Sequence, residues 1–362
     1  MSWSKSDIAF MKRALSLAAR GAGYTSPNPM VGAVIVKHGQ LISSGYHRRF
    51  GGLHAEIEAI RSGGEKVRRA TMYVNLEPCS HFGKTPPCVD EIVKAGISEV
   101  IVSMIDPNPL VAKTGIGKLR QRGVKVKLGL LASEAERLNE SYTKYIVKHE
   151  PFVIMKAAVT LDGMIADASG SSQWISSERS RRFVHGLRRK VDSVLVGIET
   201  VLRDDPELTV RLVRSRRNPT RIVLDSRLRI PLEARILDRA ASTIIVTGAK
   251  KEKAELLKQR GKAVWLVKTN EEGEIDLKDF LARAVGEGIT NILVEGGRKI
   301  YSSFLRERLV DKFYLFIAPK FLGDGIRLVE RLDIKRVEHS LQLKDVSLRR
   351  VDSDTLVIAY PQ

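Results

Sequence analysis

The stretch from residue 53 to residue 88 decides how the rest of this 362-residue sequence is interpreted. It contains LHAE at residues 53–56 and NLEPCSHFGKTPPC at residues 75–88. The chain has two cysteines, and both of them, Cys79 and Cys88, lie in this stretch. Together with His54 they form a donor set of one imidazole and two thiols, which suits zinc. Three protein ligands leave the fourth tetrahedral position open, and that arrangement is typical of a catalytic zinc.

Glu56 lies two residues after His54 and adds a carboxylate to the predicted site. A zinc ion with an open position acidifies water, which can then attack a carbon that carries an amino group. A nearby carboxylate can move the proton from that water to the departing ammonia. The order H-x-E followed by P-C resembles the zinc-dependent base deaminases. We therefore predict zinc at His54, Cys79 and Cys88, with Glu56 as the catalytic acid–base group.

Other interpretations of the two cysteines stay open at this point. They could be buried small side chains or a disulfide, although neither explains Pro78 before Cys79 or the His-x-Glu upstream. A structural zinc needs four protein ligands, and His81 is available as the fourth. The spacing is also unusual, because eight residues separate Cys79 from Cys88 and common base deaminases have C-x2-C. This spacing favours a particular branch of the deaminases.

Length and composition predict a globular protein in the cytoplasm, with two domains or with two domains and a small third one. The chain is 43% hydrophobic and 28% charged, and no apolar run reaches the length of a membrane span. Its first residues lack the apolar segment of a secretory signal. Two cysteines bound to metal leave none for disulfides, as expected in a reducing compartment. The net charge of +19 fits an anionic small molecule as well as nucleic acid, so it does not separate these partners.

The first half of the sequence alternates helical and strand-like segments. Helical periodicity covers residues 7–20, and a β-branched strand follows the proline-flanked Asn28. Asn28 is either a turn residue or a group that presents its amide to a flat heterocycle. Further segments are expected as a helix at 54–61, strands at 71–76, 100–104 and 124–128, a helix opening at Pro78, and helices at 111–121 and 133–147. The pattern breaks at residues 148–151, which we predict as the domain boundary.

The second half begins again with a strand at residues 152–159 and continues as an α/β pattern. A helix is expected at 179–190, and buried strands at 193–197, 220–225, 242–247 and 263–267. A strand that starts at Asn291 runs into Gly296-Gly297 and a helix, where backbone amides could hold a phosphate. The G-x-G-x-x-G pattern is not present there, so a Rossmann dinucleotide fold is not supported.

These motifs, taken in order, closely resemble the bifunctional deaminase–reductases of riboflavin biosynthesis. The resemblance covers essentially the whole chain, and the eight-residue gap between the cysteines is the spacing of that family. The segments that carry it are PNPMVG at 27–32, LHAE at 53–56, LEPCSH at 76–81, TPPC at 85–88, LDG at 161–163, SG at 169–170, QWI at 173–175, DDP at 204–206, LT at 208–209 and VEGG at 294–297.

The resemblance implies a fold of two α/β domains and two successive reactions. Residues 1–147 would form a cytidine-deaminase-like three-layer domain, and residues 151–362 a dihydrofolate-reductase-like domain. The first would deaminate 2,5-diamino-6-ribosylamino-4(3H)-pyrimidinone 5′-phosphate with zinc. The second would use NADPH to reduce the ribosyl group to ribityl, which gives 5-amino-6-(5-phosphoribitylamino)uracil. A homo-oligomer, dimer or tetramer, is expected, and neither nucleic acid nor membrane is an expected partner.

The resemblance also implies residues for each site. Beside the zinc ligands and Glu56, the deaminase substrate would contact Asn28, His47 and Lys84. The reductase substrate would contact Ser172, Arg188, Leu208, Arg211 and Glu295. The NADPH site would be formed by Ala158, Trp174, Thr200, Asp204, Ser226, Gly297, Arg298, Lys299, Ile300, Tyr301, Ser302 and Ser303. Arg188 and Arg211 offer forked donors that suit a phosphate, and Lys156 and Asp204 are both candidates for proton transfer.

Two rival functions remain to be distinguished. One is a base deaminase that acts on nucleic acid, which the basic charge encourages and the 6% aromatic content does not. The other keeps the deaminase and makes residues 152–362 a non-catalytic binding or oligomerisation module. The polar stretch at 200–211 and the VEGG segment favour a catalytic second domain instead.

Overall fold

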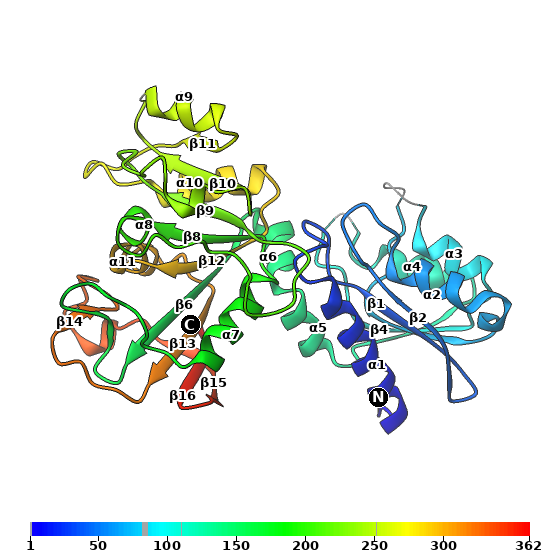
Figure 1. Cartoon of the computed structure of the whole chain (residues 1–362). Helices are drawn as coiled ribbons and strands as arrows, with labels where there is room; N and C mark the ends of the chain where they lie inside the picture. Colours follow the sequence, from blue (N-terminus) through cyan, green and yellow to red (C-terminus); the bar gives the residue numbers. More distant parts are fainter. Residues whose placement is uncertain (1, 82–85, 110, 251) are drawn as a thin grey trace. The chain divides into compact units, whose positions relative to one another are not determined.

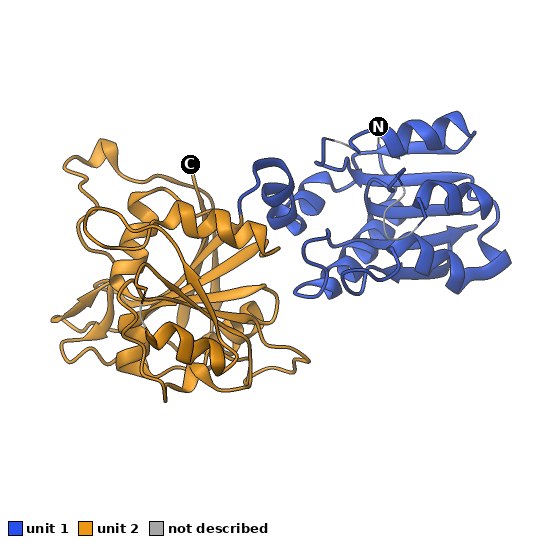
Figure 2. Ribbon diagram, turned by 90° about the horizontal axis from the view of Figure 1, so that it is seen from above, with its two compact units in different colours: residues 1–150 blue, residues 151–362 orange. Residues whose placement is uncertain are grey.

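The computed structural model describes residues 2–81, 86–109, 111–250 and 252–362. The chain divides into two compact units, Met1–Glu150 and Pro151–Gln362, which Figure 2 colours separately. Each unit is built on its own β-sheet (Figure 1). Within the described residues, no helix combines the length and the apolar character that crossing a bilayer would need.

Unit 1 is a three-layer α/β structure. Its five-stranded sheet has the order β2-β1-β3-β4-β5, in which β3, β4 and β5 are parallel and β1 is antiparallel to both β2 and β3. The strands are β1 (Gly32–Lys37), β2 (Gln40–Tyr46), β3 (Thr71–Leu76), β4 (Glu99–Met104) and β5 (Lys125–Leu128). The helices are α1 (Lys5–Ala18), α2 (Ala55–Gly63), α3 (Cys88–Lys94), α4 (Thr114–Gln121), α5 (Ala132–Leu138) and α6 (Glu140–Lys148).

Alternation along the strands of unit 1 fills two hydrophobic layers. Ala33 and Ile35 of β1 point to one face, where α2, α3 and α4 pack, whereas Val34 and Val36 point to the face covered by α1. Successive side chains of a strand point to opposite faces, so a strand that is buried on both faces is apolar throughout. Both ends of the predicted zinc motif lie at the start of helices on the α2–α3 face.

Unit 2 contains a nine-stranded sheet with the order β11-β10-β9-β8-β12-β6-β13-β16-β15, and a separate pair of β7 and β14. The strands from β11 to β13 in that order are parallel, and β16 and β15 are antiparallel additions at one edge. The strands are β6 (Phe152–Thr160), β7 (Met164–Asp167), β8 (Ser193–Gly197), β9 (Thr220–Leu224), β10 (Thr243–Thr247), β11 (Ala263–Leu266), β12 (Asn291–Gly296), β13 (Lys312–Ala318), β14 (Gly325–Arg327), β15 (Leu343–Val351) and β16 (Asp354–Pro361).

Helices cover both faces of the parallel part of this sheet. One layer packs the strands against α10 and α11, and the other packs them against α7, α8 and α9. The helices are α7 (Glu178–Arg188), α8 (Ile198–Asp204), α9 (Glu252–Gln259), α10 (Leu277–Gly286) and α11 (Arg298–Arg306). In such sheets ligands bind beyond the carboxyl ends of the parallel strands. Here β8 and β12 each run directly into a helix, α8 and α11.

Three element boundaries differ from the sequence prediction. No helix opens at Pro78; the helix begins at Cys88, because Pro86-Pro87 holds the preceding backbone extended and Pro87 occupies the N-cap. The helix expected at 111–121 starts at Thr114. The single helix expected at 133–147 is two helices, because the chain turns at Asn139 between α5 and α6.

Candidate active sites

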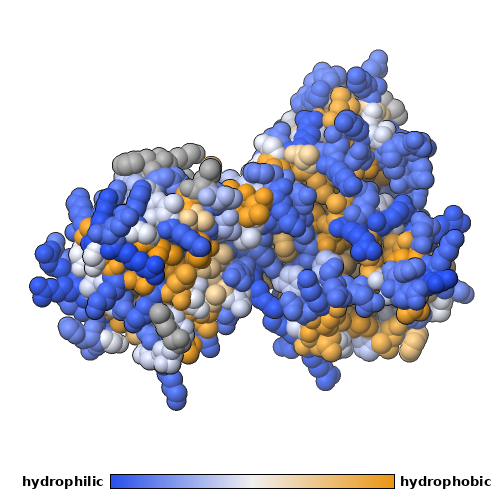
Figure 3. Space-filling model, turned by 180° about the vertical axis from the view of Figure 1, so that it is seen from behind, coloured by the Kyte–Doolittle hydropathy of each residue, from blue (hydrophilic) through white to orange (hydrophobic). Residues whose placement is uncertain are grey.

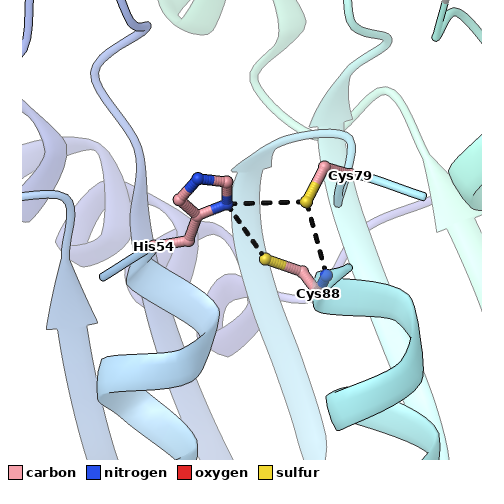
Figure 4. A group of neighbouring side chains, drawn as sticks. All are labelled: His54, Cys79 and Cys88. Atoms are coloured by element: carbon pink, nitrogen blue, oxygen red, sulfur yellow. Dashed lines mark hydrogen bonds between the residues drawn. The ribbon is translucent and has the colours of Figure 1, made fainter. Parts of the chain in front are cut away.

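Three side chains in unit 1 converge to form a metal-binding cluster (Figure 4). His54 is the N-cap of α2, Cys88 is the first residue of α3, and Cys79 lies in the segment that follows β3. The Nδ1 atom of His54 is 3.2 Å from Sγ of Cys88 and 3.5 Å from Sγ of Cys79. Tetrahedral ligands at ordinary Zn–S and Zn–N lengths stand about 3.6 Å apart, so this cluster fits zinc.

The surroundings of the cluster favour an ionised sulfur at Cys79, whereas the Cys79 hydrogen bond and burial raise the pKa of Cys88. The backbone N–H of Cys88 donates to Sγ of Cys79 over 3.3 Å, so the start of α3 supports Cys79 although no helix begins at Pro78. Hydrogen bonds from the Cys88 thiol and from His54 lower the pKa of Cys79 to about 4. His81 is exposed and, among the described residues, does not belong to the cluster. The described ligands therefore number three, as a zinc with an open position requires.

Glu56 lies in the first turn of α2 and is almost completely buried. Burial raises the pKa of its carboxyl group, and the charge of His54 opposes this shift. Its Oε2 atom has no hydrogen-bond partner among the described residues. A buried carboxylate oxygen normally has a partner. The open oxygen therefore indicates a place for water or substrate beside the metal cluster.

The residues predicted for the pyrimidine lie next to this cluster and form a chain of hydrogen bonds. Nδ1 of His47 is 2.9 Å from the carbonyl oxygen of Leu53, which can only accept, so Nδ1 carries the proton. Nε2 of His47 then accepts from Nδ2 of Asn28 over 3.2 Å. This leaves the Oδ1 atom as the acceptor of the Asn28 side chain. Lys84 lies outside the described residues.

A second site occupies a cavity of about 1150 Å³ in unit 2, at the carboxyl ends of the parallel strands. The residues predicted for the reductase substrate all line it, namely Ser172, Arg188, Leu208, Arg211 and Glu295. Of the residues predicted for NADPH, Ser302 is the exception. Its buried hydroxyl donates to the Arg298 carbonyl and accepts from the Glu330 N–H, so it serves packing and does not line the cavity. The others line it: Ala158, Trp174, Thr200, Asp204, Ser226, Gly297, Arg298, Lys299, Ile300, Tyr301 and Ser303.

A buried ion pair forms the polar centre of this cavity. Arg188 donates from Nε and Nη2 to the two carboxylate oxygens of Glu295 over 2.6 and 2.9 Å, and from Nη1 to the Thr209 carbonyl over 3.0 Å. Burial opposes the ionisation of Glu295, but the charge and hydrogen bonds of Arg188 hold its pKa below the ordinary value. Arg188 is thus buried and bonded to protein partners. Arg211 also pairs with Glu207, but its side chain is half-exposed at the cavity, which makes it the more accessible of the two predicted phosphate ligands. Burial also lowers the pKa of Lys156 beside this pair.

His185 belongs to no motif of the sequence, yet it lines the same cavity from α7. Its Nδ1 accepts from the backbone N–H of Arg211 over 2.9 Å, so Nε2 carries the proton of the neutral ring. Burial and the charge of Arg188 lower the pKa of His185 to about 4, which keeps it neutral. A single histidine in an amphipathic helix carries no sequence signal for this contact.

Two glycines shape the cofactor side of the cavity. Gly297 is the N-cap of α11 and has a φ of 95°, a conformation that favours glycine. At Gly197, the N-cap of α8, a Cβ atom would come within 2.6 Å of Ile300. The starts of α8 and α11 can therefore approach closely, and free N–H groups at helix starts are suited to phosphate groups.

Comparison with known proteins now identifies the family. The RibD C-terminal domain matches residues 151–357, and the cytidine and deoxycytidylate deaminase zinc-binding region matches residues 4–104. The riboflavin biosynthesis protein RibD of Aquifex aeolicus is 44% identical over 97% of both chains. The Escherichia coli RibD is 39% identical over 96% of this chain and 97% of its own. The chain belongs to the RibD family.

Solved structures of this family have the same fold over the whole chain. A diaminohydroxyphosphoribosylaminopyrimidine deaminase/5-amino-6-(5-phosphoribosylamino)uracil reductase of Thermotoga maritima is 37% identical, covers 99% of each chain and has a TM-score of 0.90. Acinetobacter baumannii RibD is 35% identical with a TM-score of 0.89 and the same coverage. The protein is thus a bifunctional deaminase and reductase of riboflavin biosynthesis that uses zinc and NADPH. This membership decides against the nucleic-acid deaminase and the non-catalytic second domain.

Proposed function

We propose that unit 1 deaminates 2,5-diamino-6-ribosylamino-4(3H)-pyrimidinone 5′-phosphate and that unit 2 reduces the ribosyl group of the product. The end product is 5-amino-6-(5-phosphoribitylamino)uracil. The observation that carries the proposal is the presence of a zinc-type cluster with a buried carboxylate in one unit and a large polar cavity in the other. The name of the Thermotoga maritima relative, which joins a deaminase and a reductase, supports the same pair of substrates.

In the deaminase we assign metal binding to His54, Cys79 and Cys88, and proton transfer to Glu56. Zinc supplies the Lewis acidity that makes water nucleophilic near neutral pH. The open Oε2 atom of Glu56 can accept the proton of that water and return it to the departing ammonia. Oδ1 of Asn28, oriented through His47, accepts a hydrogen bond from the pyrimidine. Lys84 is assigned to the phosphate on its sequence position alone.

In the reductase we assign the ribose and phosphate to Ser172, Leu208 and Arg211, with the Arg188–Glu295 pair at the centre of the site. Arg211 is half-exposed at the cavity, and its Nη1 contacts Thr209 and Glu207. NADPH supplies the hydride. Trp174, Thr200 and the turn at Gly297 orient the cofactor. Lys156 and Asp204 both line this cavity and remain the two candidates for proton transfer.

Ammonia release and NADPH consumption, measured on the same sample, test this proposal. The pyrimidine phosphate is supplied with NADPH for both measurements. We expect both signals, with ammonia release first. Ammonia without NADPH consumption would leave unit 2 without the proposed activity. A folded, zinc-loaded protein that gives neither signal would contradict the substrate assignment.

Removal of the metal should separate the two activities. After treatment with a chelator, we expect ammonia release to fall to background, because the three ligands no longer hold a Lewis acid. NADPH consumption with pre-deaminated substrate should stay unchanged, since no described residue of the unit 2 cavity belongs to a metal cluster. Added Zn²⁺ should restore ammonia release. Loss of NADPH consumption on chelation would show that the metal supports more than the deaminase.

We further propose that the protein forms a homo-oligomer through the edge strand β15. All but the last of its residues are exposed, including Leu348 at 68% and Val346 at 55%. At that edge the sheet ends, and no described strand pairs with the outer side of β15. An exposed edge strand can pair with a further strand, and a second copy can supply one by two-fold symmetry. Figure 1 places β15 and β16 in the lower part of unit 2, and Figure 3, which shows the molecule from behind, has apolar side chains exposed in the lower part of the same unit.

The substitution Leu348→Glu should weaken this contact. A charge on each copy would face the other copy across the interface, so we expect the molar mass in light scattering to fall from that of an oligomer to that of one chain. Leu256→Glu in α9 is the matched control. Leu256 is also exposed, at 46%, and α9 contacts β11, the strand at the opposite edge of the sheet from β15. A wild-type protein that is already monomeric, or a variant with unchanged mass, would contradict this interface.

We place the enzyme in the cytoplasm. Both cysteines are free thiols assigned to the metal site, and a reducing compartment preserves such thiols.

A further inference from the structure

Two buried asparagines hold the peptide of Met30 in unit 1. The Met30 N–H donates to Oδ1 of Asn139 over 2.8 Å, and the Met30 carbonyl accepts from Nδ2 of Asn139 over 3.0 Å and from Nδ2 of Asn75 over 2.9 Å. Oδ1 of Asn75 accepts from the N–H of Gly32 over 2.8 Å. The exposed fractions of Asn75 and Asn139 are 0% and 1%. Because an N–H can only donate, these contacts also fix the orientation of each carboxamide.

The clamped residue lies in the loop that carries Asn28. This loop precedes β1 and has no strand or helix of its own. The Asn28 N–H donates to the Thr25 carbonyl over 2.8 Å, and at Met30 the backbone groups are satisfied by side chains. Met30 is two residues from Asn28, whose Nδ2 is bound to His47 beside the metal cluster. The Met30 peptide is therefore the anchored end of the segment that presents Asn28.

Asn139 reaches this loop from a distant part of the sequence. It lies 109 residues after Met30, at the turn between α5 and α6. The zinc-binding region shared with other deaminases ends at residue 104, so Asn139 lies beyond it. The interruption of the helix at Asn139 also has a local consequence: a side chain at the turn can point to Met30 with both its donor and its acceptor engaged.

We propose that Asn139 is a positioning residue of the deaminase, which acts through the Met30 peptide on Asn28. The α5–α6 segment, residues 132–148, is then part of the deaminase site and not only a connection to unit 2. This inference rests on the proposed role of Asn28 in binding the pyrimidine. A loop held at Met30 keeps Oδ1 of Asn28 at one distance from the metal cluster, and small displacements of positioning groups are costly in rate.

The substitution Asn139→Ala tests the proposal in the full-length, zinc-loaded enzyme. Both hydrogen bonds to Met30 are lost, so we expect kcat/KM for ammonia release to fall about 10-fold to 100-fold, mainly through KM. Asn139→Asp is the second variant, since it keeps the size of the side chain but sets an oxygen against the Met30 carbonyl. Asn139→Asp should also raise KM for ammonia release. Zinc content, and NADPH consumption with pre-deaminated substrate, should stay at wild-type values.

Thr143→Val provides the matched control. Thr143 lies one turn further along α6, and its buried hydroxyl has no partner among the described residues. Its replacement should leave KM unchanged, whereas a general sensitivity of α6 to substitution would raise KM here as well.

The double variant Asn28→Ala with Asn139→Ala separates positioning from a purely structural role. If Asn139 acts through Asn28, the double variant should be no worse than Asn28→Ala alone, because the two effects are not additive. Additive losses, or a wild-type KM in both Asn139 variants, would overturn the inference. If Asn28→Ala itself leaves KM unchanged, the proposed role of Asn28 fails instead.

Discussion

The substitution Glu56→Gln should lower ammonia release by about 10³-fold while the protein still binds zinc and still reduces pre-deaminated substrate. Glutamine keeps the shape of the side chain but cannot accept and return a proton. In the structure, one oxygen of the Glu56 carboxylate has no partner among the described residues, although the side chain is 3% exposed. That oxygen is the open acceptor which the reaction needs. With the original substrate, NADPH consumption should also stop, because its substrate is no longer formed.

The matched control for this variant is Glu58→Gln on the same helix. Glu58 accepts a hydrogen bond from the exposed Arg48 over 2.8 Å and takes no part in the cluster. We expect ammonia release to change less than about twofold, as for a surface ion pair of little energetic weight. Substantial ammonia release by Glu56→Gln at full zinc occupancy would remove Glu56 from the proton-transfer step.

The metal site is the part of the molecule that the sequence predicts best. Its ligands lie in short motifs, and the chemistry of zinc restricts which residue types can serve. His54 and Cys88 lie at the starts of α2 and α3, and the packing of these two helices on one face of the sheet brings them to one point. What the sequence did not predict was the source of support for Cys79, which comes from the backbone of Cys88, nine positions away, and not from a helix of its own.

The reductase cavity shows why other residues escaped prediction. Resemblance to a family predicts which positions line a site, but it does not predict the partners of each side chain. Arg188 suited a phosphate by its chemistry, yet tertiary packing places it against Glu295 and the Thr209 carbonyl. His185 holds the backbone at Arg211 through a contact across 26 positions, and no local pattern encodes such a contact.

The pair of Arg188 and Glu295 should have the largest effect on stability. Arg188→Met leaves Glu295 buried without its main partner, and breaking a buried pair in this way costs about 3–5 kcal/mol. We expect a lower free energy of unfolding for unit 2 and loss of NADPH consumption. The free energy is measured by urea denaturation, with the fluorescence of Trp174 and Trp265 as the signal. Arg189→Met is the control, because Arg189 is exposed and its guanidinium donates to the backbone carbonyl of Arg214. Its effect should stay within about 0.5 kcal/mol.

The pH dependence of this loss follows from the pKa of Glu295. Arg188 holds that pKa below the ordinary value, so its stabilising effect is complete above the ordinary carboxyl pKa and is lost as the pH falls through the lowered one. The difference in unfolding free energy between wild type and Arg188→Met should therefore be largest near neutral pH and shrink in acid. A difference that grows in acid would contradict an ionised Glu295.

A double substitution separates the effect of the unpaired buried charge from the effect of lost side-chain packing. If the cost of Arg188→Met comes from an unpaired buried carboxylate, Arg188→Met with Glu295→Leu should regain most of the lost stability, because apolar side chains can replace a buried ion pair. The double variant should still not consume NADPH, since Arg188 and Glu295 form the polar centre of the cavity. Stability restored without activity would mean that the pair is retained for the reaction. If stability were not restored, the Arg188 contact with the Thr209 carbonyl would be the more important one for holding the fold.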